Sequence, residues 1–287
     1  MTGGGLVFEN ERIQQDYEAL LADSALAHVR MGKVDALLGG IRKSSLYIIG
    51  ASPGTGKTTL VGQWADELAM DGHPVIFVNL EMPREQLVRK SISRFSGKAI
   101  PLSGIGGDAG GCASDLAKAM VWYKENVSSN IAYTDDPITP VDLSVYVSDV
   151  MRERERPPIV FVDYAQIMPP ASSRMYTDER SIVKDTVAGL RHVANGHGCA
   201  VIAISSIRRT DYGKAVIGLD GLAEAQNLEY GADLVAYLSV PGKGVEQAQN
   251  LTKAVRPVTF SVVKNRYGEL GSTNLVFDTR FASFEEA

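Results

Sequence analysis

The stretch ASPGTGKTTL, at residues 51–60, constrains the fold more than any other part of this sequence. An apolar run at 46–50 precedes it, and a helical pattern at 58–72 follows it. The stretch fits the pattern G-x-x-x-x-G-K-[ST], with Ala51 in the first position. In such loops glycine lets backbone N–H groups turn onto phosphate oxygens, and the next helix presents its positive N-terminus. The sequence therefore predicts a strand–loop–helix unit that binds a nucleoside triphosphate.

Several residues of this loop have an expected role. Lys57 would place its ammonium group on the β- and γ-phosphates, and the Thr58 hydroxyl would bind Mg²⁺. Gly54 and Gly56 allow the turns that bring the backbone close to the phosphates. The predicted nucleotide-binding residues are Ala51, Ser52, Pro53, Gly54, Thr55, Gly56, Lys57, Thr58 and Thr59.

Two carboxylates follow buried apolar runs elsewhere in the chain. Asp163 ends the run PIVFVD, and Glu81 follows the run VIFVNL. Open α/β sheets bind ligands at the carboxyl ends of their strands, where Ser205 is also expected. Asp163 would complete the Mg²⁺ site opposite Thr58. Glu81 would deprotonate an attacking water, which favours hydrolysis over phosphoryl transfer to a small molecule. The alternative for Glu81 is a helix-capping acid before MPREQL.

The segment KNRYG, at residues 264–268, places two cations near each other late in the chain. Lys264 and Arg266 are two residues apart at the end of a predicted strand, so they are expected to point the same way. Such cations could reach a phosphate across a subunit boundary, where an arginine contributes about 10³ to 10⁵ to turnover. The alternative is a pair of solvated surface cations on a hairpin.

Strands alternate with helices along most of the chain. This pattern favours an α/β fold with a mostly parallel sheet, helices on both faces and a C-terminal hairpin. The glycine-dense stretch at 103–111 predicts a loop, and Thr139 is expected to cap a helix that begins at Pro140. Strands are predicted at 46–50, 74–81, 130–136, 159–168, 200–206, 232–240, 258–266 and 273–278. Helices are predicted at 9–31, 58–72, 84–97, 115–127, 139–156 and 178–198.

Composition limits the partners and the compartment. The net charge is −5, so no overall basic field indicates nucleic-acid binding, and any such contact would need a local basic patch. Cys112 and Cys199 form no CxxC pair, which argues against zinc and fits a reducing cytoplasm. No apolar run in the sequence is long enough to span a bilayer, so we expect a cytoplasmic protein.

Together these motifs resemble the RecA-like motor domain of DnaB-type replicative helicases. The resemblance extends from about Lys33 to Phe284, and its most specific parts are LEMPREQL and VDYAQIM. KNRYG is also similar to a segment of the RadA branchpoint proteins, whose zinc motif and protease-like tail are absent from this sequence. The other matching segments are ASPGTGKTTL, VNLEMPREQL, ITPVDL, FVDYAQIM, AISSIRR and VVKNRYG.

The resemblance implies a RecA-like ATPase domain at 33–287 and an N-terminal helical arm at 1–32, similar to a linker helix that docks on the adjacent subunit. It implies a ring-shaped homo-oligomer, expected to be a hexamer, with ATP and Mg²⁺ between subunits and single-stranded DNA in the pore. A replication partner protein is also expected. In this scheme Glu81 is the catalytic base, and Lys264 and Arg266 act on the neighbour's γ-phosphate.

The sequence departs from the family pattern at two positions. Ser206 occupies a place where the family usually has glutamine, and Ala223 replaces an arginine of the pore segment, with Glu224 retained. Loss of a phosphate-contacting cation weakens the expectation of DNA binding. The candidate DNA-contacting residues are Arg174, Arg208, Arg209, Lys214 and Glu224.

Two other functions stay open from the sequence. A RecA-family ATPase could serve as a nucleotide-gated loader or scaffold in replication or recombination without unwinding DNA, and Ala223 favours this alternative. A small-molecule kinase would take its cations from a lid in the same subunit. Glu81 and the pair Lys264–Arg266 argue against a kinase, because they indicate hydrolysis at a boundary between subunits.

Overall fold

The structure is a computed structural model that describes residues 25–97, 110–171, 179–207 and 231–287. Its helices are α2 (Gly32–Leu38), α3 (Lys57–Met70), α4 (Arg84–Ser96), α5 (Gly110–Asn126), α6 (Pro140–Arg154), η2 (Ala165–Ile167), α7 (Glu179–His197) and α9 (Val245–Thr252). Its strands are β1 (Ala25–Ala27), β2 (Ile41–Arg42), β3 (Ser45–Ala51), β4 (Val75–Asn79), β5 (Ile131–Thr134), β6 (Ile159–Asp163), β7 (Ala200–Ser206), β8 (Leu234–Ser239), β9 (Val255–Asn265), β10 (Gly271–Asp278) and β11 (Ser283–Glu286).

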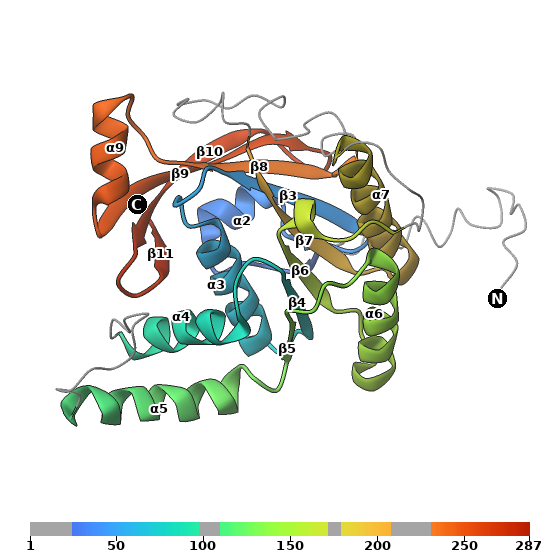
Figure 1. The fold of residues 1–287 in the computed structure, drawn as a ribbon, viewed down its shortest axis with the longest axis horizontal. Coiled ribbons are helices and arrows are strands. Elements are labelled where there is room, and N and C mark those ends of the chain that lie inside the picture. Colours follow the sequence, from blue (N-terminus) through green and yellow to red (C-terminus); the bar gives the residue numbers. More distant parts are fainter. Residues whose placement is uncertain (1–24, 98–109, 172–178, 208–230) are drawn as a thin grey trace, which may run out of the picture.

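A nine-stranded sheet crosses the molecule in the order β11-β10-β9-β8-β3-β7-β6-β4-β5 (Figure 1). The strands from β8 to β5 in this order are parallel, and β9, β10 and β11 continue the sheet in antiparallel pairs. This arrangement confirms the prediction of an α/β fold with a mostly parallel sheet and a C-terminal hairpin. The third antiparallel strand, β11, was not predicted.

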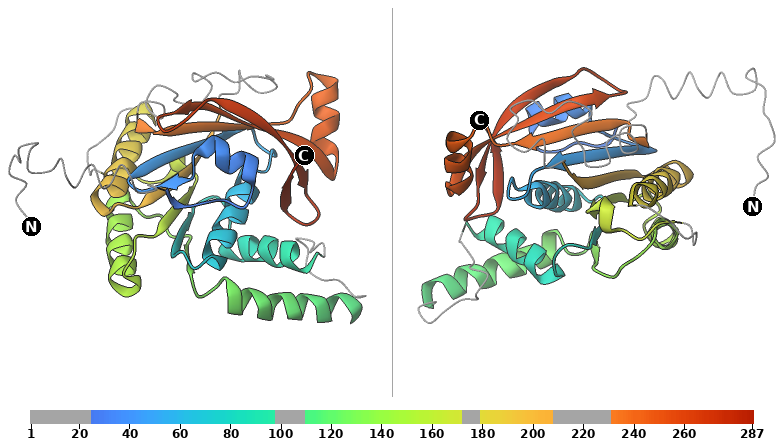
Figure 2. Two further views of the ribbon diagram at one scale, coloured as in Figure 1. Left: turned by 180° about the vertical axis from the view of Figure 1, so that it is seen from behind. Right: turned by 45° about the horizontal axis from the view of Figure 1, so that its top comes forward.

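Helices cover both faces of this sheet, so its central strands are apolar on both sides (Figures 1 and 2). One hydrophobic core joins α2, α3, α4 and α5 to one face, and Trp64 packs edge to face with Phe260 there, with ring centroids 6.0 Å apart. The other core joins α6 and α7 to the opposite face. Among the described helices, none combines the length and the apolar character needed to cross a bilayer.

Local sequence signals explain where several elements begin and end. Thr139 and Asp142 form a reciprocal capping box at the start of α6, as predicted for Thr139 and Pro140. Gly97 has φ 61° and ends α4 in the left-handed region. Asp66 on α3 is fully buried and pairs with Arg94 on α4, with Nη1 and Oδ2 2.6 Å apart. That ion pair fixes α4 against the helix that follows the glycine-rich loop.

Three predicted boundaries are wrong. The helix predicted at 9–31 does not include Ala25–Ala27, which forms a strand with Ile41–Arg42. The side chains of residues 27–31 alternate between buried and exposed, which is the two-residue period of an extended chain and not that of a helix. The strand predicted at 159–168 ends at Asp163 and turns into η2, and α5 begins at Gly110 inside the predicted loop. Residues 1–24 lie outside the described part, and the division of the chain at residue 32 stays a prediction.

Candidate nucleotide site

The glycine-rich loop connects the central strand β3 to α3, as predicted. Gly54 and Gly56 have φ values of 77° and 101°, which side-chain-bearing residues rarely adopt. A Cβ on Gly56 would also lie 2.7 Å from Cε1 of Phe277 and 2.8 Å from Cζ of Phe284. Gly56 is the N-cap of α3 and supplies no side-chain cap. The first N–H groups of α3 are therefore oriented for an anion.

Residues of the C-terminal strands β9, β10 and β11 contact this loop and the start of α3. Phe277 on β10 and Phe284 on β11 stack with ring centroids 4.3 Å apart, against Gly56. Gln63 on α3 donates from Nε2 to the Phe284 carbonyl over 3.0 Å and accepts from the Phe284 N–H over 2.8 Å. Arg256 on β9 donates to the Gly54 carbonyl over 2.6 Å. The conformation of the loop thus depends on residues near the other end of the sequence.

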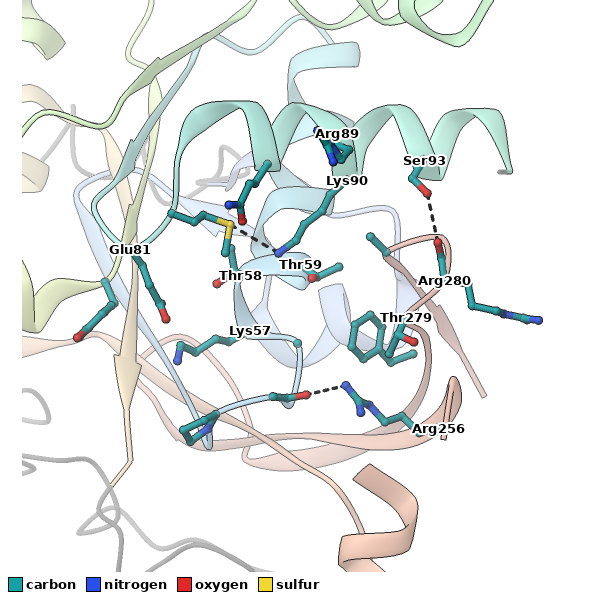
Figure 3. Close-up of a pocket in the computed structure, with 18 of the residues that line it drawn as sticks. Lys57, Thr58, Thr59, Glu81, Arg89, Lys90, Ser93, Arg256, Thr279 and Arg280 are labelled. Carbon is teal, nitrogen blue, oxygen red and sulfur yellow. Dashed lines mark hydrogen bonds between the residues drawn. The ribbon is translucent and has the colours of Figure 1, made fainter. Parts of the chain in front are cut away.

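A cavity of about 650 Å³ opens above the loop, between α4 and the turn that joins β10 to β11 (Figure 3). Its volume suits a nucleotide. Lys57 and Glu81 both extend into it, and Arg256 and Thr279 lie at its other end (Figure 3). Its lining residues are Pro53, Gly54, Gly56, Lys57, Thr58, Thr59, Glu81, Met82, Gln86, Arg89, Lys90, Ser93, Tyr164, Ser206, Arg256, Phe277, Thr279, Arg280 and Ala282.

Asp163 lies at the carboxyl end of β6, next to Asn79 of β4 in the sheet. Its side chain is fully buried, and neither carboxylate oxygen accepts a hydrogen bond of regular geometry, although the Thr58 hydroxyl lies close by. Burial raises the pKa of Asp163 to about 6, although the Thr58 hydroxyl acts in the opposite direction and Glu81 raises it further. A buried carboxylate without partners is costly unless a cation or a proton joins it. Asp163 and Thr58 therefore fit a Mg²⁺ ion.

That metal would need oxygen ligands beyond the protein's carboxylates. Within the described ranges, no three His, Cys, Asp or Glu side chains converge on one point. Mg²⁺ commonly takes one or two protein oxygens together with water and phosphate oxygens. The donor set of Asp163 and Thr58 thus fits a metal that arrives with a triphosphate.

Glu81 is positioned by the turn that follows β4. Its side chain is exposed and lines the cavity. The N–H of Leu80 donates to the carbonyl of Asp163 over 2.7 Å, and the side-chain amide of Asn79 donates to the carbonyl of Met82. The first bond ties the residue before Glu81 to the strand that carries Asp163, and the second closes the turn around Glu81. Its expected role as a base stays a prediction.

The sequence argument missed the polar face of α4. Gln86, Arg89, Lys90 and Ser93 recur at helical spacing and line the cavity. Lys90 is partly buried, and burial lowers its pKa, while the nearby carboxylates of Asp163 and Glu81 act in the opposite direction. Figure 3 shows Lys90 extending from α4 toward Thr58 and Thr59. The spacing of polar residues just after Glu81 was the signal that could have identified this face.

Lys264 and Arg266 do not enter this cavity. In the sheet Asn265 lies opposite Leu234, and Leu234 lies opposite Tyr47 at the start of β3. The glycine-rich loop follows the other end of β3, about 16 Å away at 3.3 Å per residue. Strand β9 ends at Asn265, so strand alternation does not extend to Arg266, and a shared direction of the two cations stays a prediction.

Other predicted residues are only partly described. Ser206 ends β7 beside Ala51 and lines the cavity, so the departure from the family pattern lies at the site itself. Ser205 accepts a hydrogen bond from Nε2 of Gln166 over 2.6 Å. The candidate DNA-contacting residues all lie outside the described residues, as does Ala223; they are Arg174, Arg208, Arg209, Lys214 and Glu224.

The family model described as "DnaB-like helicase C terminal domain" matches residues 28–286. The chain belongs to this family. The resemblance to DnaB-type helicases is thereby confirmed. The DnaB-like domain is 27% identical over 259 residues to the replicative DNA helicase DnaB of Pasteurella multocida, an alignment covering 88% of this chain and 53% of the relative. It is 25% identical over 260 residues to that of Haemophilus influenzae, again with 88% and 53% covered.

Solved structures share the fold of the DnaB-like domain. A DnaB-like replicative helicase, solved in a study of its interactions with primase, has a TM-score of 0.81 at 20% identity, covering 98% of this chain and 68% of that chain. The ATPase domain of G40P has a TM-score of 0.79 at 20% identity, covering 99% and 100%. The predicted RecA-like fold is confirmed by these neighbours. The chain spans about half the length of the curated relatives it matches.

Proposed function

We propose that this chain is an ATP-hydrolysing, DnaB-like helicase motor domain that acts on single-stranded DNA as a ring-shaped oligomer. One observation carries the proposal. The glycine-rich loop, Thr58 and Glu81 line one cavity, and the buried Asp163 lies beside Thr58, while Lys264 and Arg266 lie at the opposite end of the central strands. The cavity of one chain is thus open to cations from a second copy.

The residues of this chain divide the hydrolysis among them. Lys57 and the first N–H groups of α3 hold the β- and γ-phosphates. Glu81 accepts a proton from a water whose oxygen attacks the γ-phosphorus, while the bond from that phosphorus to the bridging oxygen breaks. The products are ADP and inorganic phosphate. Lys90, which faces Glu81 and Asp163 from α4, would hold positive charge on the side opposite Lys57.

Mg²⁺ would bind at Thr58 and Asp163, where it would neutralise charge on the β- and γ-phosphates. The Asp163 oxygens suit this role because they are buried and accept no hydrogen bond of regular geometry. Arg266 of an adjacent copy would stabilise the charge that develops on the γ-phosphate. The far end of the cavity, near Thr279 and Arg280, leaves room for the nucleoside.

Assembly and DNA binding complete the proposal. The relatives named DnaB are replicative DNA helicases, and one solved neighbour was studied with primase, so a replication partner protein is proposed here as well. The ring is proposed to be a hexamer. Burial of the free Cys199 is in keeping with a reducing cytoplasm.

The test is ATP turnover with and without a single-stranded oligonucleotide, together with particle size by light scattering with and without an ATP analogue. We expect turnover to rise with the oligonucleotide, salt-sensitive DNA binding, and particles of several copies. Turnover that ignores DNA, with ATP-dependent assembly on a protein partner, would instead support a nucleotide-gated scaffold. A constant monomer that turns over ATP at full rate would refute the shared site.

A further inference from the structure

Asp233, just before β8, carries two arginines on one buried carboxylate. Its side chain is 1% exposed. Oδ1 accepts from Nη1 of Arg266 over 3.1 Å, and Oδ2 contacts Nη1 of Arg191 from α7. The backbone repeats the link, since the N–H of Arg266 donates to the carbonyl of Asp233 over 3.0 Å. Arg266 is thus held at its backbone and at its side chain by the same residue.

The same carboxylate is anchored to the strand that leads to the glycine-rich loop. Oδ2 of Asp233 accepts from the N–H of Leu46 over 2.9 Å, and the N–H of Asp233 donates to the carbonyl of Leu46 over 2.8 Å. Tyr267 adds a second tie, because its hydroxyl lies 2.8 Å from Oγ of Ser45. Leu46 and Ser45 belong to the fully buried start of β3. The position of Arg266 is therefore set by a fully buried part of the central strand.

The side chain of Arg266 is held but not enclosed. Half of it is exposed, whereas Arg191 is 25% exposed and Asp233 is 1% exposed. One carboxylate faces two guanidinium groups, so the cluster keeps a surplus positive charge that has no counter-charge among these three side chains. If Arg266 moved toward an outside anion, Arg191 would still neutralise Asp233. The arrangement can release one cation without leaving a buried charge unpaired.

We propose that Asp233 is a positioning residue for Arg266, aiming its guanidinium at the triphosphate of the adjacent copy, and that Arg191 keeps Asp233 paired when Arg266 engages that anion. The proposal rests on the proposed function, since it takes Arg266 to act across a subunit boundary. A misplacement of about 1 Å can cost about 10²-fold in rate. Loss of the Asp233 charge should therefore act on turnover rather than on nucleotide binding.

The first experiment compares Asp233→Asn with Arg152→Gln as a control. Asparagine still accepts from the Leu46 N–H but no longer pairs with Arg266. We expect Asp233→Asn to lower kcat about 10- to 100-fold with the Kd of an ATP analogue changed less than threefold. Arg152→Gln removes an exposed cation that pairs with Asp149 on α6, outside this cluster, and should keep kcat within about threefold. An equal loss of kcat in both variants would refute the proposal.

The second experiment uses mixed rings made by co-expression. A subunit with Asp233→Asn still has an intact pocket with Lys57 and Glu81. A subunit with Glu81→Gln still has Asp233 to hold its Arg266 in position. About one boundary in four of a random 1:1 ring then combines an intact pocket with an intact arginine. We expect the mixture to exceed the activity of either variant alone. A residue that only stabilises its own subunit would not be complemented in this way.

Control pairings separate this proposal from the proposed function. Arg266→Ala mixed with Glu81→Gln should also regain activity, and if it does not, the shared site itself is wrong. If that pair regains activity and the Asp233→Asn pair does not, only the role of Asp233 is refuted. Adding Asp233→Asn to Arg266→Ala should change kcat less than threefold, and a further 10-fold loss would count against the proposal.

Folding is monitored by thermal melting of each variant. Asp233→Asn leaves the guanidinium groups of Arg191 and Arg266 beside a neutral amide, and this variant alone could fail to fold for that reason. In that case the double variant Asp233→Asn/Arg191→Gln removes one of the two positive charges. The same mixing experiment then applies to the double variant. Complementation by Glu81→Gln supports the proposal, and its absence overturns it.

Discussion

Arg256 donates from Nη2 to the carbonyl oxygen of Gly54 over 2.6 Å, although 202 residues separate the two in sequence. Its guanidinium also lies over the ring of Phe277, 4.9 Å from the centroid. Arg256 therefore fixes the peptide of a glycine that has a φ of 77° and, without a side chain, few restrictions on its backbone.

We predict that Arg256→Met weakens binding of an ATP analogue about tenfold, because a hydrogen bond from a charged donor contributes about 1.5 kcal/mol. The retained length of the side chain keeps most of the packing on Phe277. Isothermal titration would measure the change. Arg152→Met is the matched control, since Arg152 is 79% exposed and pairs with Asp149 on α6. Equal affinity in wild type and Arg256→Met would show that the loop holds its shape without this bond.

A second prediction concerns the packing under Gly56. Gly56→Ala should lower the free energy of unfolding by at least about 2 kcal/mol and abolish nucleotide binding, since its Cβ meets Phe277 and Phe284 at 2.7 and 2.8 Å. Gly62→Ala, in the next turn of α3 with open space around it, should instead raise stability by about 0.5–1 kcal/mol. Chemical denaturation would compare the two. A stable, nucleotide-binding Gly56→Ala protein would contradict the packing described here.

The division of roles between Lys57 and Glu81 gives a third prediction. Lys57→Ala should abolish nucleotide binding, because it removes the ammonium that holds the phosphates. Glu81→Gln should bind nucleotide within about threefold of wild type and lower kcat at least about 10²-fold, because only the proton acceptor is lost. Fluorescent-nucleotide binding and phosphate release would measure both. Equal loss of binding in the two variants would exclude Glu81 as the base.

The raised pKa of Asp163 gives a pH-dependent prediction. Folding shifts this pKa upward to about 6, so the charged form is penalised in the folded state. The penalty is absent below the unfolded pKa near 4, grows from about pH 4 to pH 6 and is constant above that. We therefore predict that Asp163→Asn raises the free energy of unfolding by about 1–3 kcal/mol at pH 7.5, and that this gain disappears toward pH 4.

The measurement for Asp163→Asn is chemical denaturation in a chelator without nucleotide, at pH 4, 6 and 7.5. The chelator matters because a cation at Asp163 would remove the penalty. Asp142→Asn serves as a control that should lower the free energy of unfolding at neutral pH instead of raising it. Hydrogen bonds from Thr139 lower the pKa of Asp142 at an exposed helix cap, so its charged form is favoured in the folded state. A gain from Asp163→Asn that is the same at all three pH values would rule out the titration of this carboxylate as its cause.

Local patterns predicted the residues of the site that follow strands. Gly54 lies in the loop that follows β3, Lys57 begins the helix after that loop, and Asp163 is the last residue of β6, so the strands bring all three to one end of the sheet. The polar face of α4 could also have been predicted, because the polar residues from Gln86 to Ser93 recur at helical spacing.

The contacts that support the glycine-rich loop could not be predicted, because the residues that make them are distant from the loop in sequence. Nothing near Arg256 indicates that it bonds to Gly54, and nothing near Gln63 indicates that it holds Phe284. The strand at Ala25–Ala27 was mistaken for helix because its partner, Ile41–Arg42, follows only after α2. Apolar spacing in a short segment cannot decide between a helix and a strand when tertiary pairing does.

The two hydrogen bonds between the Gln63 side chain and the Phe284 backbone have a consequence for folding during translation. Translation produces the phosphate-binding loop early and β11 among the last elements. A ribosome-bound chain that ends at Asp278 would already contain the glycine-rich loop, Glu81 and Asp163, but not Phe284, one of the two rings that pack against Gly56. Competence to bind nucleotide would then arise only after β11 has been made and has packed against α3, which would delay capture of ATP by unfinished copies.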